Sequence, residues 1–277
     1  MSVRGPSRSR PLTLLPFGVA VAILASGCDE DKKARLVAST QSSAQRAAAS
    51  ASAVASVTPQ ASASAPAKKE KKKVECKDTP EVTSADEVLM ADLRKKLLKK
   101  PGEAIKTAEL AQVKSINLTA PNAKVNELDP CIFPKLTALK HLFLGPGELD
   151  DLSPIANLTQ LESLRASLNN VEDLRPLEKL GLLDRVDLGH THIRDISVLG
   201  KLGNLTEIQL DDTHVSDISP LAGCKKLEKL SIKKTLVSDL SPLRDLTKLK
   251  FIYIEGSAIA DIGVLANLTT RGLKIVP

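Results

Sequence analysis

The chain has 277 residues, of which 43 are leucine, while it contains only four Phe, one Tyr and no Trp. A core must therefore be built from aliphatic side chains, and four cysteines are too few for a disulfide scaffold. The formal net charge is +6, but residues 81–277 carry 26 basic against 27 acidic side chains, so the basic excess lies before residue 81. Nucleic-acid binding needs a positive face, and this near-neutral region argues against it.

The first 27 residues have the organisation of a signal peptide. Three arginines within the first ten residues precede an apolar stretch from Leu12 to Leu24. Such a stretch is of signal-peptide length and too short for a comfortable membrane span. Residues 1–27 are therefore predicted to direct export and to form no part of the fold.

Residues 24–28 read L-A-S-G-C and resemble the lipobox of bacterial lipoproteins. The resemblance implies that Cys28 becomes the first residue of the mature chain and carries acyl chains such as palmitate. Several acyl chains anchor firmly, whereas one alone binds a membrane only marginally. The expected location is the bacterial cell envelope, on a membrane facing the periplasm or the cell surface. An ordinary secretion signal followed by a chance cysteine is the alternative.

Residues 28–80 are predicted to be a disordered tether. Twenty of the thirty residues from Ala38 to Ala67 are Ala or Ser, so the segment has no apolar face to bury. A basic run at 68–73 contains five lysines and Glu70. It is interpreted as a solvated charge run, with contact to anionic lipid or wall polymer as the alternative.

Aliphatic residues then recur every 22 residues without insertion. The first column consists of Leu139, Leu161, Leu183, Leu205, Leu227 and Leu249. Five more columns begin at Leu142, Leu144, Leu149, Leu152 and Ile155, and the column from Leu152 ends at Ile262. Self-similarity at a fixed period of this length indicates stacked structural repeats around one continuous core.

The repeat, with its L-x-x-L-x-L core, resembles the leucine-rich repeat in the 22-residue form of internalins and related bacterial surface proteins. The resemblance implies an α/β solenoid, a horseshoe with a parallel β-sheet on its concave face and short helical or 3-10 returns. The solenoid is expected over 113–277, behind an N-terminal helical cap over 81–112. A terminal strand around Leu273 and Ile275 is expected to fall one residue short of the period.

The expected cap begins with a capping box at Ser84–Glu87. A helical stripe of Val88, Leu89, Leu93, Leu97 and Leu98 follows and ends before Pro101. A second short segment is expected from Thr107 to Gln112.

Two polar columns are interpreted as parts of the fold. An acidic residue recurs in every repeat at Asp151, Asp173, Asp195, Asp217, Asp239 and Asp261. Each is expected to accept hydrogen bonds from turn N–H groups rather than to bind calcium. Nearby Ser-Pro pairs are read as an N-cap followed by proline at the first helical position. A second column, expected to bond the turn backbone, consists of Asn169, Thr191, Thr213, Thr235 and Ser257.

His190, His192, His214 and Asp212 are close in the repeat register and raise the question of a zinc site. Without a third firm ligand, surface histidines are the favoured interpretation, and no metal or other cofactor is predicted. Cys224 occupies a leucine position and is expected to be a small buried apolar residue.

A disulfide between Cys76 and Cys131 is possible outside the cytoplasm and is left open.

Side chains alternate along a strand, so the neighbours of the inward Leu and Ile residues should face the concave side. The predicted partner-binding residues on that side are Phe143, Arg165, Arg185, Asp187, Gln209, Lys229, Phe251 and Tyr253. Exposed aromatics beside arginine are typical of binding hot spots. The alternative is that Phe143 packs under the first return and Phe251 and Tyr253 pack under the C-terminal end.

No nucleophile–base pair or phosphate-binding loop is visible, so the chain is not expected to be an enzyme. The leading hypothesis is a membrane-anchored protein that binds another macromolecule through the concave face, with a protein as the favoured partner. The alternatives are a structural envelope or cell-wall-contacting lipoprotein without a specific partner, and an enzyme that uses the histidine cluster.

Overall fold

The computed structural model describes residues 74–77, 79–121 and 123–277. The predicted leader, Cys28 and the predicted tether up to residue 73 lie outside these residues, so lipidation and the tether stay predictions. Among the described residues, no helix combines the length and the apolarity needed to cross a membrane.

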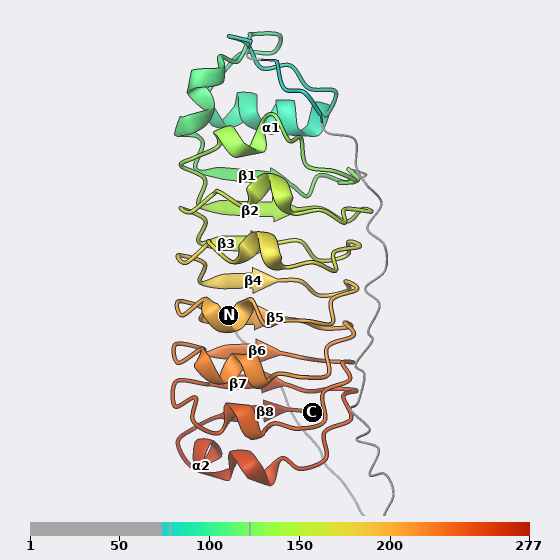
Figure 1. The fold of residues 1–277 in the computed structure, drawn as a ribbon, viewed down its shortest axis with the longest axis vertical. Helices are drawn as coiled ribbons and strands as arrows, with labels where there is room; N and C mark the ends of the chain where they lie inside the picture. Colours follow the sequence, from blue (N-terminus) through green and yellow to red (C-terminus); the bar gives the residue numbers. More distant parts are fainter. Residues whose placement is uncertain (1–73, 78, 122) are drawn as a thin grey trace, which may run out of the picture. The chain divides into compact units, whose positions relative to one another are not determined.

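The described part forms one parallel eight-stranded sheet in which spatial order follows chain order (Figure 1). The strands are β1 (Ser115–Leu118), β2 (His141–Leu144), β3 (Ser163–Arg165), β4 (Arg185–Asp187), β5 (Glu207–Gln209), β6 (Lys229–Ser231), β7 (Phe251–Tyr253) and β8 (Lys274–Val276). From β2 to β7, paired residues are 22 positions apart. This confirms the predicted leucine-rich-repeat solenoid.

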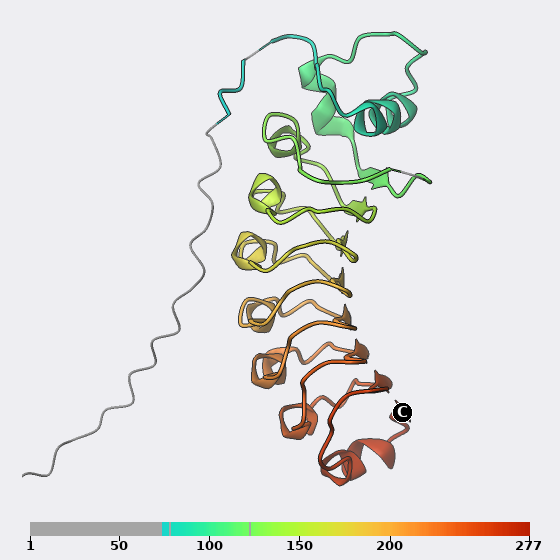
Figure 2. The same ribbon diagram turned by 90° about the vertical axis from the view of Figure 1, so that its right-hand side faces the viewer.

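Short 3-10 helices lie opposite the strands in each repeat, so that the strands line the inner side of the curve (Figure 2). These helices are η1 (Thr107–Gln112), η2 (Phe133–Lys135), η3 (Ser153–Ile155), η4 (Arg175–Leu177), η5 (Leu199–Lys201), η6 (Ser219–Gly223), η7 (Ser241–Leu243) and η8 (Gly263–Leu265). The short α-helix α2 (Ala266–Thr269) follows η8.

The core is a continuous aliphatic stack between the strands and the 3-10 helices. Its aliphatic columns are buried as predicted, except that Ile259 is only partly buried and Ile262 is exposed. Ile262 is 53% exposed, because it belongs to the last return and no further repeat covers it. Cys224 is fully buried, and this burial raises the pKa of its thiol to about 11, so the thiol stays protonated at neutral pH.

The N-terminal cap is built by α1 (Glu87–Lys96), which buries Leu89, Met90 and Leu93 and packs against β1. Asp92 on this helix accepts a hydrogen bond of 3.0 Å from the backbone N–H of Asn117. The cap therefore covers the end of the core and satisfies a donor on the edge strand, where unpaired groups invite association with other chains.

Two details of the predicted cap helix were wrong. Its N-cap is Asp86, whose carboxylate accepts from the backbone N–H of Leu89 at 2.9 Å, whereas Ser84 accepts from Asp86 and donates to Asp129. The helix ends at Lys96, so Leu98 lies beyond it and is 91% exposed.

The open question about the cysteines is resolved by a disulfide between Cys76 and Cys131. It links the first described residues to the long return after β1. Two backbone contacts hold the same segment, a bridge between Glu81 and Lys106 and a hydrogen bond of 2.9 Å from Thr107 N–H to the Pro80 carbonyl.

The last strand departs from the repeat. Phe251 pairs with Lys274 and Ile252 with Ile275, so the step from β7 to β8 is 23 residues. The predicted strand is present, but it falls one residue beyond the period rather than one short of it. This shift places Lys274 and Val276 in the outward columns of the sheet.

Candidate functional site

The outward positions of the sheet form two continuous columns, which we call the concave face. The first column contains Ser115, His141, Ser163, Arg185, Glu207, Lys229, Phe251 and Lys274. The second contains Asn117, Phe143, Arg165, Asp187, Gln209, Ser231, Tyr253 and Val276. All eight predicted partner-binding residues lie in these columns, and none belongs to the buried core.

The N-terminal half of the concave face holds a groove of about 540 Å³. Its polar and aromatic lining includes His141, Phe143, Arg165, Arg185, Asp187 and Gln209. The rings of His141 and Phe143 are nearly parallel, with centroids 6.3 Å apart. The groove therefore combines an aromatic wall with two guanidinium groups.

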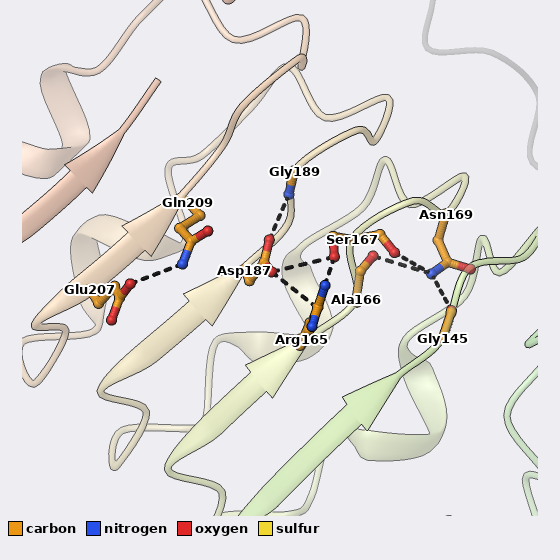
Figure 3. A network of polar contacts seen from close by, with 9 residues as sticks. All are labelled: Gly145, Arg165, Ala166, Ser167, Asn169, Asp187, Gly189, Glu207 and Gln209. Carbon is orange, nitrogen blue, oxygen red and sulfur yellow. Dashed lines mark hydrogen bonds and ion pairs between the residues drawn. The ribbon is translucent and has the colours of Figure 1, made fainter. Parts of the chain in front are cut away.

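Arg165 is held in place by neighbouring strands (Figure 3). Its Nε lies 3.3 Å from the carboxylate of Asp187 and 3.3 Å from the hydroxyl of Ser167. The backbone N–H of Gly189 donates to the same carboxylate at 3.2 Å. About half of the Arg165 side chain is nevertheless exposed. The guanidinium is thus partly fixed before any partner arrives, which reduces the entropy cost of a contact.

Acidic side chains occupy the middle of the concave face. Burial acts to raise the pKa of the Glu207 carboxyl, but the hydrogen bond from Lys229 at 2.7 Å, the positive charge of Lys229 and a hydrogen bond from Gln209 together outweigh it and hold the pKa below its usual value. The bond between Lys229 and Glu207 also raises the pKa of Lys229, so both groups are charged at neutral pH. Asp211, next to this pair, accepts from the Ser231 hydroxyl and from the Lys233 backbone N–H.

The C-terminal end of the concave face combines aromatic rings with lysines. The Nζ atoms of Lys229 and Lys233 lie 5.8 and 5.4 Å from the ring centroid of Tyr253. Lys274 lies 5.7 Å from the ring centroid of Phe251. These distances are in the cation–π range, and both rings are half-buried. The rings are flanked by lysines on the sheet surface and lie outside the core.

Sequence reasoning missed three residues of this surface. His141 and Lys233 lie on or beside the concave face but are not among the predicted partner-binding residues. Lys274 was missed because a step of 22 residues from Phe251 leads to Leu273. Continuing the outward column with the alternation of the last strand, instead of the fixed period, would have found it.

The acidic column is structural in every repeat. Each aspartate accepts a hydrogen bond of 2.6–3.0 Å from the backbone N–H two residues further on. Hydrogen bonds from the Ser241 hydroxyl and backbone N–H lower the pKa of Asp239. The predicted role of this column is confirmed, whereas the predicted Ser N-caps are wrong, because the 3-10 helices follow Leu or Ile at the capping position and the serines make no capping bond.

The second polar column also bonds the turn backbone. Asn169 donates to the carbonyls of Gly145, Ala166 and Ser167 (Figure 3). It also accepts a hydrogen bond from the backbone N–H of Leu149. The threonines that replace it donate to a single carbonyl three residues back, as Thr213 does to Leu210 at 2.7 Å. Both columns therefore stabilise the turns.

The histidines make one polar contact, between His190 Nδ1 and the Asp212 carboxylate at 3.0 Å. The rings of His192 and His214 are 6.1 Å apart. Within the described part of the chain, no group of three His, Cys, Asp or Glu side chains is arranged to hold a metal ion.

No family model matches the chain, and no curated protein sequence matches it. Solved structures do. An internalin (inlF) of Listeria monocytogenes superposes with a TM-score of 0.60 and 27% identity over 67% of this chain and 54% of its own. Internalin C2 of the same organism superposes with a TM-score of 0.58 and 25% sequence identity over 69% of this chain and 92% of its own. The chain thus spans about half of the inlF structure.

Proposed function

We propose that this protein is anchored by lipid in the bacterial cell envelope and binds another protein through its concave face. Its leucine-rich-repeat fold and the similarity to internalins support protein–protein interaction in general. Because the fold is an interaction scaffold, binding is favoured over catalysis. A fold alone does not define a ligand, so the argument for the face depends on its side chains.

The observation that carries the proposal is the arrangement of aromatic rings and cations at both ends of the concave face. Phe143 lies with Arg165 and Arg185 at one end, and Phe251 and Tyr253 lie among lysines at the other. Aromatic and arginine side chains dominate the energetics of protein interfaces.

The two aromatic ends are far enough apart to engage a folded partner. Phe143 is on β2 and Tyr253 on β7, which are five strand steps apart, or roughly 24 Å at the usual strand spacing. A surface of this length fits an interface of standard size, about 800 Å² on each side. Between the two ends, Asp187 and Glu207 are compensated by Arg165 and Lys229, and Asp211 adds one further carboxylate. We expect the partner to carry a basic group opposite Asp211 and acidic or aromatic groups opposite the two ends.

Site-specific photo-crosslinking tests the binding face. A photoreactive amino acid at Gln209, in the middle of the concave face, is expected to give one defined adduct in native envelopes. The same probe at Lys201, on the outer side, is the control and is expected to give none. The adduct should disappear in the Phe143→Ser/Tyr253→Ser double variant, while folding is checked by thermal denaturation. Failure to find any concave-face adduct would favour an envelope protein without a specific partner.

Anchoring is tested by intact mass spectrometry of the membrane-extracted chain. The chain is expected to begin at Cys28 and to exceed the peptide mass by the mass of its acyl chains. Cys28→Ala should release or misprocess the protein. An unmodified chain that begins elsewhere would contradict the lipid anchor and leave the concave-face proposal intact.

A further inference from the structure

A solvent-exposed leucine lies two residues beyond the end of the cap helix. Leu98 is 91% exposed and has a φ of 55°, in the left-handed region. The N–H of Lys99 bonds the carbonyl of Arg94 at 2.9 Å and the N–H of Leu98 bonds that of Lys95 at 3.4 Å. These two bonds form a Schellman motif, in which the left-handed residue is usually glycine. Leucine at this position adds conformational strain and exposes an apolar side chain, so the fold gains nothing from it.

Left-handed residues also occur after the strands, but in a different setting. Leu168 has a φ of 61° and a side chain that is only 48% exposed, in a shallow groove beside Asn169 and His190. Leu98 differs from Leu168 in its near-complete exposure and in the charge of its sequence neighbours.

Basic residues surround Leu98 in the sequence, which reads R-K-K-L-L-K-K from residue 94 to 100. Lys99 is neutralised by Glu103 at 3.1 Å and Glu109 at 2.9 Å. By contrast, Lys95, Lys96 and Lys100 are exposed, and within the described part of the chain none of them forms an ion pair with a carboxylate. Cations at a helix C-terminus favour the helix dipole, which accounts for Lys95 and Lys96 but not for Leu98 or Lys100.

We propose that Leu98 with Lys95, Lys96 and Lys100, together called the Leu98 tip, docks the cap onto an anionic lipid surface. An apolar side chain beside lysines is the combination that binds a membrane interface, since the lysines attract anionic headgroups and the leucine enters the acyl boundary. A nucleic acid or another soluble polyanion would be bound by the lysines without needing an exposed leucine.

The place of the tip in the fold fits this partner. It belongs to the cap, which follows residues 1–73 in the chain. The Cys76–Cys131 disulfide fixes the residues just before the cap to the return after β1. The concave face belongs to the repeats, so the cap can contact lipid without using the residues proposed to bind a protein. The two proposals are therefore independent.

Vesicle sedimentation tests the docking. The chain from residue 29 onward keeps the entire core, which lies between Val82 and Ile275, and lacks both the leader and the acylated cysteine. It is mixed with vesicles of phosphatidylcholine alone or with added phosphatidylglycerol. We expect binding only to the anionic vesicles, with affinity falling as salt is raised.

Two variants separate the apolar part from the charged part. Leu98→Gly is expected to weaken vesicle binding about tenfold with no loss of thermal stability, because glycine suits the left-handed position. Replacement of Lys95, Lys96 and Lys100 by glutamate is expected to reduce binding about fivefold or more for each lysine. Leu168→Gly is the matched control, with the same relief of strain at a distant turn and no change in vesicle binding.

Three results would overturn the proposal. The first is that Leu98→Gly binds anionic vesicles as tightly as the wild type, and the second is that the chain binds neutral and anionic vesicles equally. The third concerns dextran sulfate, a soluble polyanion: Leu98→Gly loses affinity for it by the same factor as it loses affinity for vesicles. In each case the photo-crosslink from Gln209 should persist in Leu98→Gly, so failure of the docking proposal is distinguishable from failure of concave-face binding.

Discussion

The turn side of the repeats and the concave face differ in how strictly they repeat. The turn column carries the same residue in six successive units, from Asp151 to Asp261. By contrast, the second column of the concave face carries a different residue type on each successive strand, from Phe143 through Arg165 and Asp187 to Tyr253. Both columns are equally regular in space, so regular geometry alone does not require identical residues.

This difference distinguishes the positions whose residue type the fold requires from the positions whose residue type it does not constrain. Every turn presents the same backbone N–H to be satisfied, and aspartate meets this requirement each time. Outward strand positions have no such shared requirement, so their chemistry is available for a partner. Positions that carry the same residue in every repeat are therefore the ones that the fold requires, and positions that vary are the ones that it does not constrain.

The largest effect is expected in the core. Leu210→Ala should lower the free energy of unfolding by about 2–5 kcal/mol, because the side chain is fully buried in mid-solenoid. Leu236→Ala is the matched control, since this leucine is 57% exposed and its truncation should cost less than about 0.5 kcal/mol. Urea denaturation measures both. Equal effects would contradict the register of the core.

The second polar column should come next. Asn169→Ala removes four hydrogen bonds and leaves the N–H of Leu149 unsatisfied, so a cost of about 2–4 kcal/mol is expected. Thr213→Ala removes one bond, to the Leu210 carbonyl, and should cost about 1 kcal/mol. If denaturation curves show the two variants to be equally stable, the additional bonds of the asparagine contribute nothing.

The acidic column tests the structural side of the comparison directly. Asp217→Ala removes the acceptor for the Ser219 N–H at 2.7 Å and should cost about 0.5–2 kcal/mol, as loss of a cap does. Partner binding at equal folded concentration should not change. Calcium is titrated into the wild-type protein by calorimetry as well. Tight calcium binding together with unchanged stability of the variant would make this column a functional site.

Much of this architecture could be predicted from the sequence because the period is unbroken. The aliphatic columns and the role of the aspartates both follow from a requirement that recurs in each repeat. The serine N-caps fail inside the repeats. The errors about burial lie towards the two ends, where the period stops. Leu98 and Ile262 were assigned to buried stripes, but no neighbouring unit covers them.

The site was less predictable for a related reason. Outward columns could be read from alternation, yet the 23-residue step hid Lys274. Which side chains pair across strands depends on rotamers and on charges from neighbouring repeats, as in the contact between Arg165 and Asp187. Such contacts leave no periodic signal.

The acidic column should also give stability a dependence on pH. The Ser241 hydroxyl and backbone N–H lower the pKa of Asp239 in the folded state below its unfolded value of about 3.9. Its stabilising contribution is therefore present above that value and is lost as the pH falls through the folded-state pKa. The stability difference between wild type and Asp239→Ala should be constant above about pH 5 and should shrink as the pH falls from about 5 towards 2 in urea denaturation. A difference independent of pH would mean that the charge of the carboxylate contributes nothing.

The smallest effect on stability is expected on the concave face. A variant there tests most directly whether the concave columns differ from the turn columns in serving a partner. Lys274→Ser removes a cation 5.7 Å from the Phe251 ring and should change the free energy of unfolding by less than about 1 kcal/mol. Lys201→Ser is the matched control on the outer side, where an exposed ion pair with Glu178 at 2.6 Å contributes little. Both variants should therefore fold like the wild type. Because a binding surface depends on the groups it presents and not on its own stability, only Lys274→Ser should weaken the Gln209 photo-crosslink, by about tenfold if the lysine is a hot spot. If both variants weaken the crosslink equally, the partner does not distinguish the two sides of the solenoid, and the variation along the concave columns has no bearing on its binding.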